Sequence, residues 1–276
     1  MMSFSLQFVL VLIGTFMIAL VLTPLVRLFS FKIDAVDYPN ARRINTKPMP
    51  SAGGLAIVIA FSIATLVFIP MLTSTTAPIK SFLSYTLPVV GAGWIIALTG
   101  LIDDVKELSA KKKMIGILLA ASLVWFLTDF RLNDFKIPFG GPLLHFEPWL
   151  SYLLTVIWIV SITNAVNLID GLDGLVSGVS IISLVTMGIV SYFFLPVPNL
   201  FLTMTIFVLV ASIAGFFPFN YHPAILYLGD TGALFIGFMI SVLSLQGLKN
   251  ATAVAVVTPM IILGVPITDT FLAIIR

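Results

Sequence analysis

The sequence has no cysteine and few charged side chains. Only 9% of its 276 residues are Asp, Glu, Lys or Arg, while 59% are hydrophobic; in ordinary soluble domains about a quarter of the residues are charged. The lack of cysteine excludes disulfides and thiolate metal sites, and the lack of charge excludes a water-soluble surface. The net charge of +2 says little by itself, and we expect no nucleic-acid partner. The composition predicts an all-α polytopic membrane protein embedded in a lipid bilayer.

Stretches without Asp, Glu, Lys or Arg recur along the whole chain, and a helix needs about 20 apolar residues to cross the hydrocarbon core. The longest stretch is too long for one span, and Pro196 and Pro198 near its middle disfavour a continuous helix. Dividing it there gives nine predicted transmembrane helices. The first has neither a basic n-region nor a cleavage pattern, so we expect a retained helix. The stretches are residues 1–26, 48–79, 81–102, 114–128, 148–169, 174–229, 231–248 and 250–268.

Basic residues are distributed unevenly between the two sides of this predicted bundle. When the connections are numbered alternately, ten Lys and Arg residues fall on one side and four on the other. The positive-inside rule places the richer side in the cytoplasm and the N-terminus outside. Nine of the twelve acidic residues lie on or near the same side, although carboxylates follow no such rule. Cytoplasmic loops that are simply more polar are one explanation. The loops are short, however, and this favours a second explanation. The acids then converge at one membrane face, where they hold a metal ion together with phosphate groups.

The connection before the second span, residues 37–50, combines prolines with basic residues and predicts an ordered, non-helical loop. Arg42, Arg43 and Lys47 could bind phosphate, although basic loops are expected on the inside of any membrane protein. Gly53 and Gly54 open the following helix, and paired glycines permit close backbone approach to a ligand. Taken alone, this loop leaves the functional and the topological explanation open.

Asp103 and Asp104 are adjacent carboxylates at the end of a predicted helix. They repel each other, and a position beside lipid is unfavourable unless a cation compensates. Mg²⁺ prefers oxygen ligands and is commonly held by one or two carboxylates together with substrate phosphates. The alternative is a solvated helix end, at which the lysines at 111–113 balance the negative charges of the two aspartates. The adjacent pair favours a functional site.

Four polar residues spaced three apart, Asn164, Asn167, Asp170 and Asp173, end the fifth span. Because glycines follow both acids, we expect both asparagines on the last helical turn and both aspartates around the bend. Two amides and two acids in an apolar run are too unfavourable to be there for packing. This element therefore predicts a functional site.

Asp230 lies between small residues at the start of the eighth span. An aspartate there could simply cap the helix and complement its dipole; together with the other polar elements, it becomes the natural metal ligand. We interpret the nearby His222 as structural. On the opposite side, polar and apolar residues alternate loosely around two glycines in residues 130–149. This pattern predicts a short extracytoplasmic β-hairpin, and nothing in it suggests a catalytic role.

At these residues the chain resembles the polyprenyl-phosphate N-acetylhexosamine-1-phosphate transferases. That family includes the enzymes that start teichoic-acid and O-antigen lipopolysaccharide synthesis, and the phospho-MurNAc-pentapeptide translocase. The resemblance extends from residues 37–54 to residues 266–276, and four motifs in the right order make it specific. The aspartate pair followed by residues 107–111 is more similar to the UDP-GlcNAc-using branch, the undecaprenyl-phosphate GlcNAc-1-phosphate transferase type, than to the pentapeptide branch.

The resemblance implies transfer of a sugar-1-phosphate from a UDP-sugar to polyprenyl phosphate, with release of UMP, at the cytoplasmic face of the bacterial cell membrane. It implies Mg²⁺ as cofactor, with Mn²⁺ as an alternative, and leaves a homodimer open. Position by position, it assigns the catalytic pair to Asp103 and Asp104, the metal ligands to Asn167 and Asp230, nucleotide binding to Asp173, Asp170 and Asn164, lipid-phosphate binding to Arg42, Arg43 and Lys47, and the start of the last cytoplasmic motif to Pro266, Asp269 and Arg276.

Family members continue beyond the position of Arg276 with a histidine-rich loop and at least one further helix. The resemblance therefore leads us to expect residues 1–276 to be a single transmembrane catalytic domain that lacks its C-terminal loop and last helix or helices. Direct attack of the lipid phosphate on the β-phosphorus and a covalent phospho-aspartate route both stay open. The rival class is a membrane transporter, but transporters place ionisable residues near the midplane and often show repeated halves, whereas these acids lie at one face.

Overall fold

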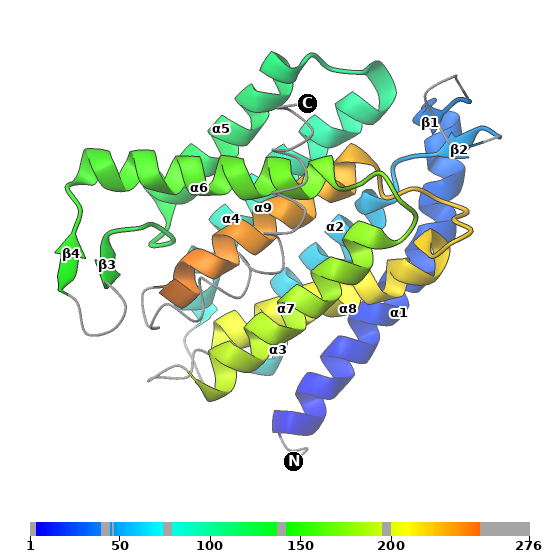
Figure 1. Cartoon of the computed structure of the whole chain (residues 1–276). Helices are drawn as coiled ribbons and strands as arrows, with labels where there is room; N and C mark the ends of the chain where they lie inside the picture. Colours follow the sequence, from blue (N-terminus) through cyan, green and yellow to red (C-terminus); the bar gives the residue numbers. More distant parts are fainter. Residues whose placement is uncertain are drawn as a thin grey trace.

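The computed structural model describes residues 4–39, 45, 47–73, 79–136, 142–194 and 200–248. Within these ranges the apolar stretches form helices that pack into a bundle, and two short strand pairs lie at its opposite ends (Figure 1). The elements are α1 (Phe4–Lys32), β1 (Val36–Asp37), β2 (Met49–Pro50), α2 (Gly54–Ile63), the π-helical turn η1 (Ala64–Phe68), α3 (Ile69–Thr73), α4 (Ile79–Lys106), α5 (Ala110–Leu127), β3 (Asp134–Lys136), β4 (Leu143–His145), α6 (Pro148–Leu168), α7 (Leu175–Phe193), α8 (Leu200–Asn220) and α9 (Gly229–Leu248).

The helices confirm an all-α polytopic membrane protein. Six segments are long and apolar enough to cross a membrane: Ser5–Lys32, Gly54–Met71, Thr86–Lys106, Pro148–Leu168, Leu175–Phe193 and Leu200–Asn220, with a shorter apolar helix at Gly229–Leu245. Helical segments occupy the first eight of the nine predicted stretches. The ninth, residues 250–268, lies outside the described residues, as does the segment 249–276 that carries Pro266, Asp269 and Arg276.

Helix α9 lies in the centre of the bundle. It packs against α4, α6 and α2, and every side chain from residue 231 to residue 245 is buried. The indole Nε1 of Trp158 on α6 donates to Ser241 O and to Ser244 Oγ, at 3.2 and 3.1 Å, and so satisfies polar groups inside this core. Helices α1, α7 and α8 form a further layer, in which α8 packs on both α1 and α7. The start of α9 is thereby brought to the ends of α4 and α6.

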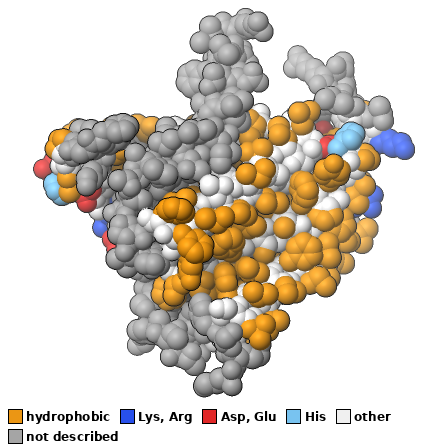
Figure 2. Space-filling view, turned by 60° about the horizontal axis from the view of Figure 1, so that its bottom comes forward, with side chains coloured by type: hydrophobic (Ala, Val, Ile, Leu, Met, Phe, Trp, Pro, Cys, Tyr) orange, Lys and Arg blue, Asp and Glu red, His pale blue; other side chains and the backbone are white. Residues whose placement is uncertain are grey.

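The outer surface is largely apolar. On α1, Ile13 and Val21 are 54% and 63% exposed, which is expected of side chains that face lipid tails. In Figure 2, hydrophobic side chains cover most of the described part of the face, with charged side chains gathered at two edges. The molecule therefore has an apolar band with a polar region at each end.

The strand pairs differ in how well the sequence predicts them. Strands β3 and β4 are antiparallel, with Asp134 opposite His145, which confirms the predicted hairpin. Strands β1 and β2 flank the predicted non-helical loop and were not expected; they pair Val36 with Pro50 and Asp37 with Met49. The π-helical turn inside the second span was not expected either, because hydrophobicity does not distinguish one helical hydrogen-bonding pattern from another.

Candidate active site

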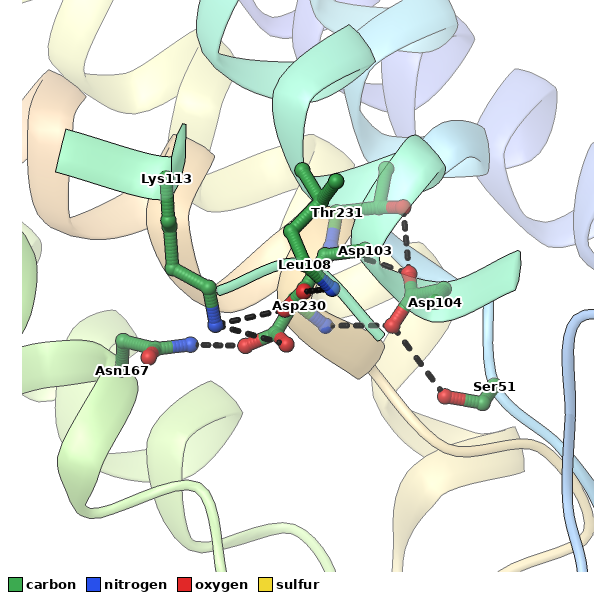
Figure 3. A network of polar contacts seen from close by, with 8 residues as sticks. All are labelled: Ser51, Asp103, Asp104, Leu108, Lys113, Asn167, Asp230 and Thr231. Atoms are coloured by element: carbon green, nitrogen blue, oxygen red, sulfur yellow. Dashed lines mark hydrogen bonds and ion pairs between the residues drawn. The ribbon is translucent and has the colours of Figure 1, made fainter. Parts of the chain in front are cut away.

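Four helices bring polar side chains together at the end of the bundle opposite the β3–β4 hairpin (Figure 1). Asp103 and Asp104 come from the end of α4, Lys113 from the start of α5, Asn167 from the end of α6 and Asp230 from the start of α9. Figure 3 shows these side chains converging on one polar network. The predicted convergence of acids is thus present for three aspartates and one asparagine.

Lys113 joins two of the acids. Its Nζ lies 2.5 Å from Oδ2 of Asp103 and 3.0 Å from Oδ2 of Asp230. Asp103 is 6% exposed and Lys113 19% exposed, so water screens this contact only partly. The other oxygen of Asp103 accepts a hydrogen bond from Leu108 N at 2.5 Å, which fixes the turn between α4 and α5. With Oδ1 held by Leu108, Oδ2 of Asp103 contacts Lys113, which also contacts Asp230 on α9.

Asp230 has partners on two other helices. Its Oδ2 accepts from Lys113, and its Oδ1 accepts a short hydrogen bond from the side-chain amide of Asn167. The carboxylate is thus held between α5 and α6, as Figure 3 shows. It is not a cap of its own helix by any hydrogen bond found among the described residues, so the simple capping explanation is not what the geometry favours.

Asp104, on α4, caps the start of α9 by accepting hydrogen bonds from its first backbone N–H groups. Its Oδ1 accepts from Asp230 N at 2.8 Å and from Ser51 Oγ at 3.3 Å. Its Oδ2 accepts from Thr231 N at 3.1 Å and from Thr231 Oγ1 at 2.5 Å. A carboxylate has about four lone-pair positions, and four donors occupy them here. Asp104 thereby fixes the start of α9, and with it the position of Asp230.

The segment before α2 also supports the start of α9, through backbone hydrogen bonds. Gly53 N donates to Tyr227 O at 3.0 Å, and Gly54 N donates to Leu228 O at 2.8 Å. A Cβ at Gly54 would lie 2.1 Å from Gly232 Cα. We expected these paired glycines to approach a ligand. That explanation is wrong for Gly54, since the close approach is to the protein's own α9 backbone.

The first residue of α9 must be a glycine for a separate reason. Gly229 has φ +71°, a left-handed conformation that side chains other than glycine rarely adopt. A Cβ there would lie 1.7 Å from Ser51 O and 2.8 Å from the Asp104 carboxylate. A side chain at this position would therefore push apart the segments that hold Asp230.

Among the described residues, the acids of this cluster outnumber the cations. The ammonium of Lys113 pairs with Asp103 and Asp230, the donors to Asp104 are Ser51, Thr231 and the backbone N–H of Asp230, and Asp170 follows the end of α6. Burial, and next the negative charge of Asp230, raise the pKa of Asp170 to about 7. Burial is the larger of the two causes, so the raised pKa reports mainly the removal of the Asp170 carboxyl from water and, to a smaller extent, the negative charge of Asp230.

Asp173 makes a second polar contact beyond α6. Its Oδ2 accepts from Ala224 N at 3.0 Å and lies 2.9 Å from His222 Nδ1. This carboxylate therefore joins the α6–α7 turn to the α8–α9 connection. As predicted, α6 ends at Leu168, with Asn167 in its last turn and both aspartates beyond it, while Asn164 lies about one turn earlier than expected. His222, which we interpreted as structural, is 80% exposed and belongs to this contact.

Two predicted residues that the structure describes, Asn164 and Lys47, are joined to the cluster by no contact found among the described residues. The amide of Asn164 donates to Val160 O of its own helix at 2.8 Å, one turn before Asn167. Lys47 is exposed on the loop before β2, and no contact among the described residues joins its side chain to the acids. Arg42 and Arg43 lie outside the described residues.

The sequence interpretation missed two members of the network, Ser51 and Thr231, and considered Lys113 only as one of the lysines that could balance Asp103 and Asp104 at a solvated helix end, whereas the structure pairs it with the buried Asp103 and with Asp230. Lys113 carried a usable signal: three lysines at 111–113 occupy the first turn of α5, where the helix dipole disfavours cations. That arrangement indicates anions from elsewhere in the fold. Ser51 and Thr231 gave no such signal, because small hydroxyl residues are common at helix starts.

The residues present suit a magnesium or manganese ion. Their carboxylate and amide oxygens are the ligands that Mg²⁺ prefers, and the Lys113 ammonium already bridges Asp103 and Asp230 as a cation would. Within the described residues, no three acidic or histidine side chains are arranged to hold a metal by themselves. A metal here would therefore share its coordination with Asn167 and with substrate phosphates, as Mg²⁺ sites commonly do.

This fold and site define a class of membrane protein that comparison with known families makes explicit. Residues 86–248 match the model of glycosyl transferase family 4, so the chain belongs to that family. The matched region contains every member of the cluster except Ser51. The resemblance inferred from the motifs is thereby confirmed.

Individual relatives are similar along most of the chain. It is 42% identical over 272 residues to a probable undecaprenyl-phosphate N-acetylglucosaminyl 1-phosphate transferase of Bacillus subtilis, covering 98% of this chain and 72% of that protein. It is 33% identical over 273 residues to the decaprenyl-phosphate N-acetylglucosaminephosphotransferase of Mycolicibacterium smegmatis, covering 91% of this chain and 66% of that protein. A phospho-N-acetylmuramoyl-pentapeptide-transferase of Staphylococcus saprophyticus is 33% identical over 251 residues, covering 86% of this chain and 74% of that protein.

Proposed function

We propose that this protein transfers GlcNAc-1-phosphate from UDP-GlcNAc to a polyprenyl phosphate, undecaprenyl phosphate by similarity, and releases UMP. The observation that carries the proposal is the convergence of Asp103, Asp230 and Asn167 beside Lys113 at one end of an apolar bundle. The similarity to transferases named for this reaction supports it. The product would be the first membrane intermediate of a cell-envelope polymer.

We propose a bundle of nine spans with the N-terminus outside and the acid cluster at the cytoplasmic face of the bacterial membrane. The bias of ten basic residues against four supports this orientation. A nucleotide-sugar donor also suits it, because such donors are made in the cytoplasm and polyprenyl phosphate lies in the membrane. Placing the site at the membrane surface gives both substrates access.

The proposed reaction is attack by a lipid phosphate oxygen on the β-phosphorus of the donor. The bond from this phosphorus to the oxygen that bridges it to the α-phosphorus breaks, and that oxygen leaves with UMP. A phosphate monoester has its second pKa at about 6 and is mostly dianionic at neutral pH, so the nucleophile needs no strong base. The residues therefore act chiefly by positioning and by neutralising charge.

The residues divide this task. Asp230 and Asn167, with Asp103 beside them, would hold Mg²⁺, which supplies charge neutralisation for the diphosphate and the leaving UMP. Asp104 positions Asp230 through the start of α9. Asp173, with Asp170 and Asn164 on the same segment, would bind the nucleotide, and Arg42, Arg43 and Lys47 the lipid phosphate.

The donor sugar is tested by comparing UDP-GlcNAc with UDP-MurNAc-pentapeptide. The protein in lipid nanodiscs would receive undecaprenyl phosphate and each donor, with and without Mg²⁺, and UMP release would be measured. We expect release from UDP-GlcNAc alone, and only with the divalent cation. Release from the pentapeptide donor alone would instead favour the second candidate, phospho-MurNAc-pentapeptide transfer, which the Staphylococcus similarity supports.

A further inference from the structure

Lys113 occupies an unfavourable position for a cation. It lies in the first turn of α5, directly after two other lysines, where the partial positive charge of the helix end repels it. Its ammonium is also largely removed from water, with the side chain only 19% exposed. Two carboxylates on other helices compensate, Asp103 on α4 and Asp230 on α9. The place of this lysine is thus determined by the same acids that would bind a metal.

The contact uses specific oxygens. Lys113 Nζ bridges Oδ2 of Asp103 and Oδ2 of Asp230, at 2.5 and 3.0 Å. The remaining oxygens are occupied, since Oδ1 of Asp103 accepts from Leu108 N and Oδ1 of Asp230 accepts from Asn167. The two Oδ2 atoms are the oxygens that both lie against Lys113 Nζ, so a cation bound between the two acids would use the oxygens that Lys113 holds. An ammonium and a divalent ion on these oxygens would repel each other, because their positive charges would lie a few ångströms apart.

We propose that Lys113 is a competing internal cation, a positioning residue that holds Asp103 and Asp230 together and must leave them when a divalent metal binds. This inference rests on the proposed function, because it takes a divalent metal at Asp230 as given. While the lysine is in place, it keeps α4 and α9 joined despite the repulsion between their acids. When a divalent metal replaces the ammonium, a charge of +2 takes the place of a charge of +1 beside Asp103 and Asp230. The lysine thereby makes metal binding weaker and more readily reversible than the carboxylates alone would.

The competition predicts two effects of opposite sign when the ammonium is removed. In Lys113→Met, the acids lose their cation, so the thermal midpoint without divalent ions falls. The metal then no longer has to displace a charge, so its affinity rises, by about tenfold for a like charge removed from this distance. A lysine that only stabilised the fold would weaken metal binding when removed. A lysine that contacted only substrate phosphate would leave metal affinity without substrate unchanged.

The test uses Mn²⁺ as the probe, because its free form gives an electron paramagnetic resonance signal. The wild-type protein and its variants in nanodiscs would be titrated with MnCl₂ without substrates, and thermal midpoints measured with and without the ion. We expect a dissociation constant about tenfold lower for Lys113→Met than for wild type. Lys112→Met is the matched control, since Lys112 is the exposed neighbour on the same turn and should leave both quantities unchanged.

A second variant keeps the test decisive if Lys113→Met does not fold. Lys113→Arg retains the charge and can bind carboxylates with two donors, so it should bind Mn²⁺ no more tightly than wild type. Equal or weaker binding by Lys113→Met, or tighter binding by Lys113→Arg, would overturn the competition while leaving the metal itself in place. Failure of the wild type to bind Mn²⁺ in any of these titrations would overturn the proposed metal, and the competition with it.

Discussion

The two polar ends of the bundle are built in different ways. At the β3–β4 end, polar pairs join residues that are close in sequence and mostly exposed: Arg131 forms an ion pair with Asp129 at 3.3 Å, and His145 Nδ1 lies 2.5 Å from Asp134 Oδ1. At the other end, Lys113 meets Asp103 and Asp230 across three helices, and Asp103 is almost fully buried. Exposed local pairs contribute about 0–1 kcal/mol. Buried acids brought together from distant segments are unfavourable in themselves, which indicates a use beyond folding.

The comparison also extends to the backbone. The cluster end is held by backbone hydrogen bonds between the segments before α2 and α9, such as Gly54 N to Leu228 O at 2.8 Å. The hairpin end is a two-stranded pair with exposed side chains along β4. A functional constellation needs rigid support to keep its geometry, and of the two ends, as far as the structure describes them, the cluster end combines such support with converging charge.

The largest predicted difference between the ends follows from removing one acid from each. Asp230→Asn takes away the carboxylate that holds Lys113 and, by proposal, the metal. A metal contributes several kcal/mol of charge stabilisation, so UMP release from UDP-GlcNAc with Mg²⁺ should fall at least about a hundredfold. Asp134→Asn makes the same chemical change in the exposed hairpin and should leave the rate within about twofold. Near-normal turnover by Asp230→Asn would remove the basis for assigning the metal there.

A smaller effect is expected where an acid acts through the backbone. Asp104→Ala leaves the N–H groups of Asp230 and Thr231 without their acceptor, which should lower the free energy of unfolding by about 1–3 kcal/mol. Asp104→Asn keeps one acceptor oxygen and should fall between Ala and wild type. Thermal midpoints in nanodiscs measure the stability, and Mn²⁺ titration reports whether Asp230 is still in position.

The kinetics of these variants separate positioning from chemistry. If Asp104 acts through α9, the turnover number should fall roughly in step with metal affinity, and excess Mg²⁺ should recover part of it. A loss of turnover in Asp104→Asn with unchanged stability and unchanged Mn²⁺ affinity would contradict the positioning role. It would instead point to direct contact with substrate.

Much of this architecture is predictable from composition and motif order, because both rest on local physics. Apolar stretches predict the spans, glycines after Asp170 and Asp173 predict the end of α6, and alternation predicts the β3–β4 hairpin. The acids themselves are visible as charges that an apolar run does not tolerate without cause. These features need no knowledge of which helices touch.

Partner choice inside the cluster was not predictable in the same way. Nothing in the sequence distinguishes Asp103 from Asp104, yet Asp103 pairs with Lys113, while Asp104 accepts hydrogen bonds from the start of α9. Successive helix residues point about 100° apart, so the packing of α4 against α5 and α9 decides which acid faces which neighbour. Likewise, the glycine at 54 predicts a close approach, but only the fold shows that α9 is what approaches.

The finest test compares two histidines that look equivalent locally. His222 and His145 are 80% and 74% exposed, and each pairs with an aspartate through Nδ1. Asp173, the partner of His222, also accepts from Ala224 N and would contact the nucleotide. His222→Ala should therefore let Asp173 move and raise KM for UDP-GlcNAc about threefold, within the range of one exposed pair. His145→Ala should leave KM unchanged, since its partner lies in the hairpin. Equal effects from both substitutions would mean that Asp173 is held for folding alone, and the proposed division between the two ends would then apply to the Asp230 cluster but not to the nucleotide side.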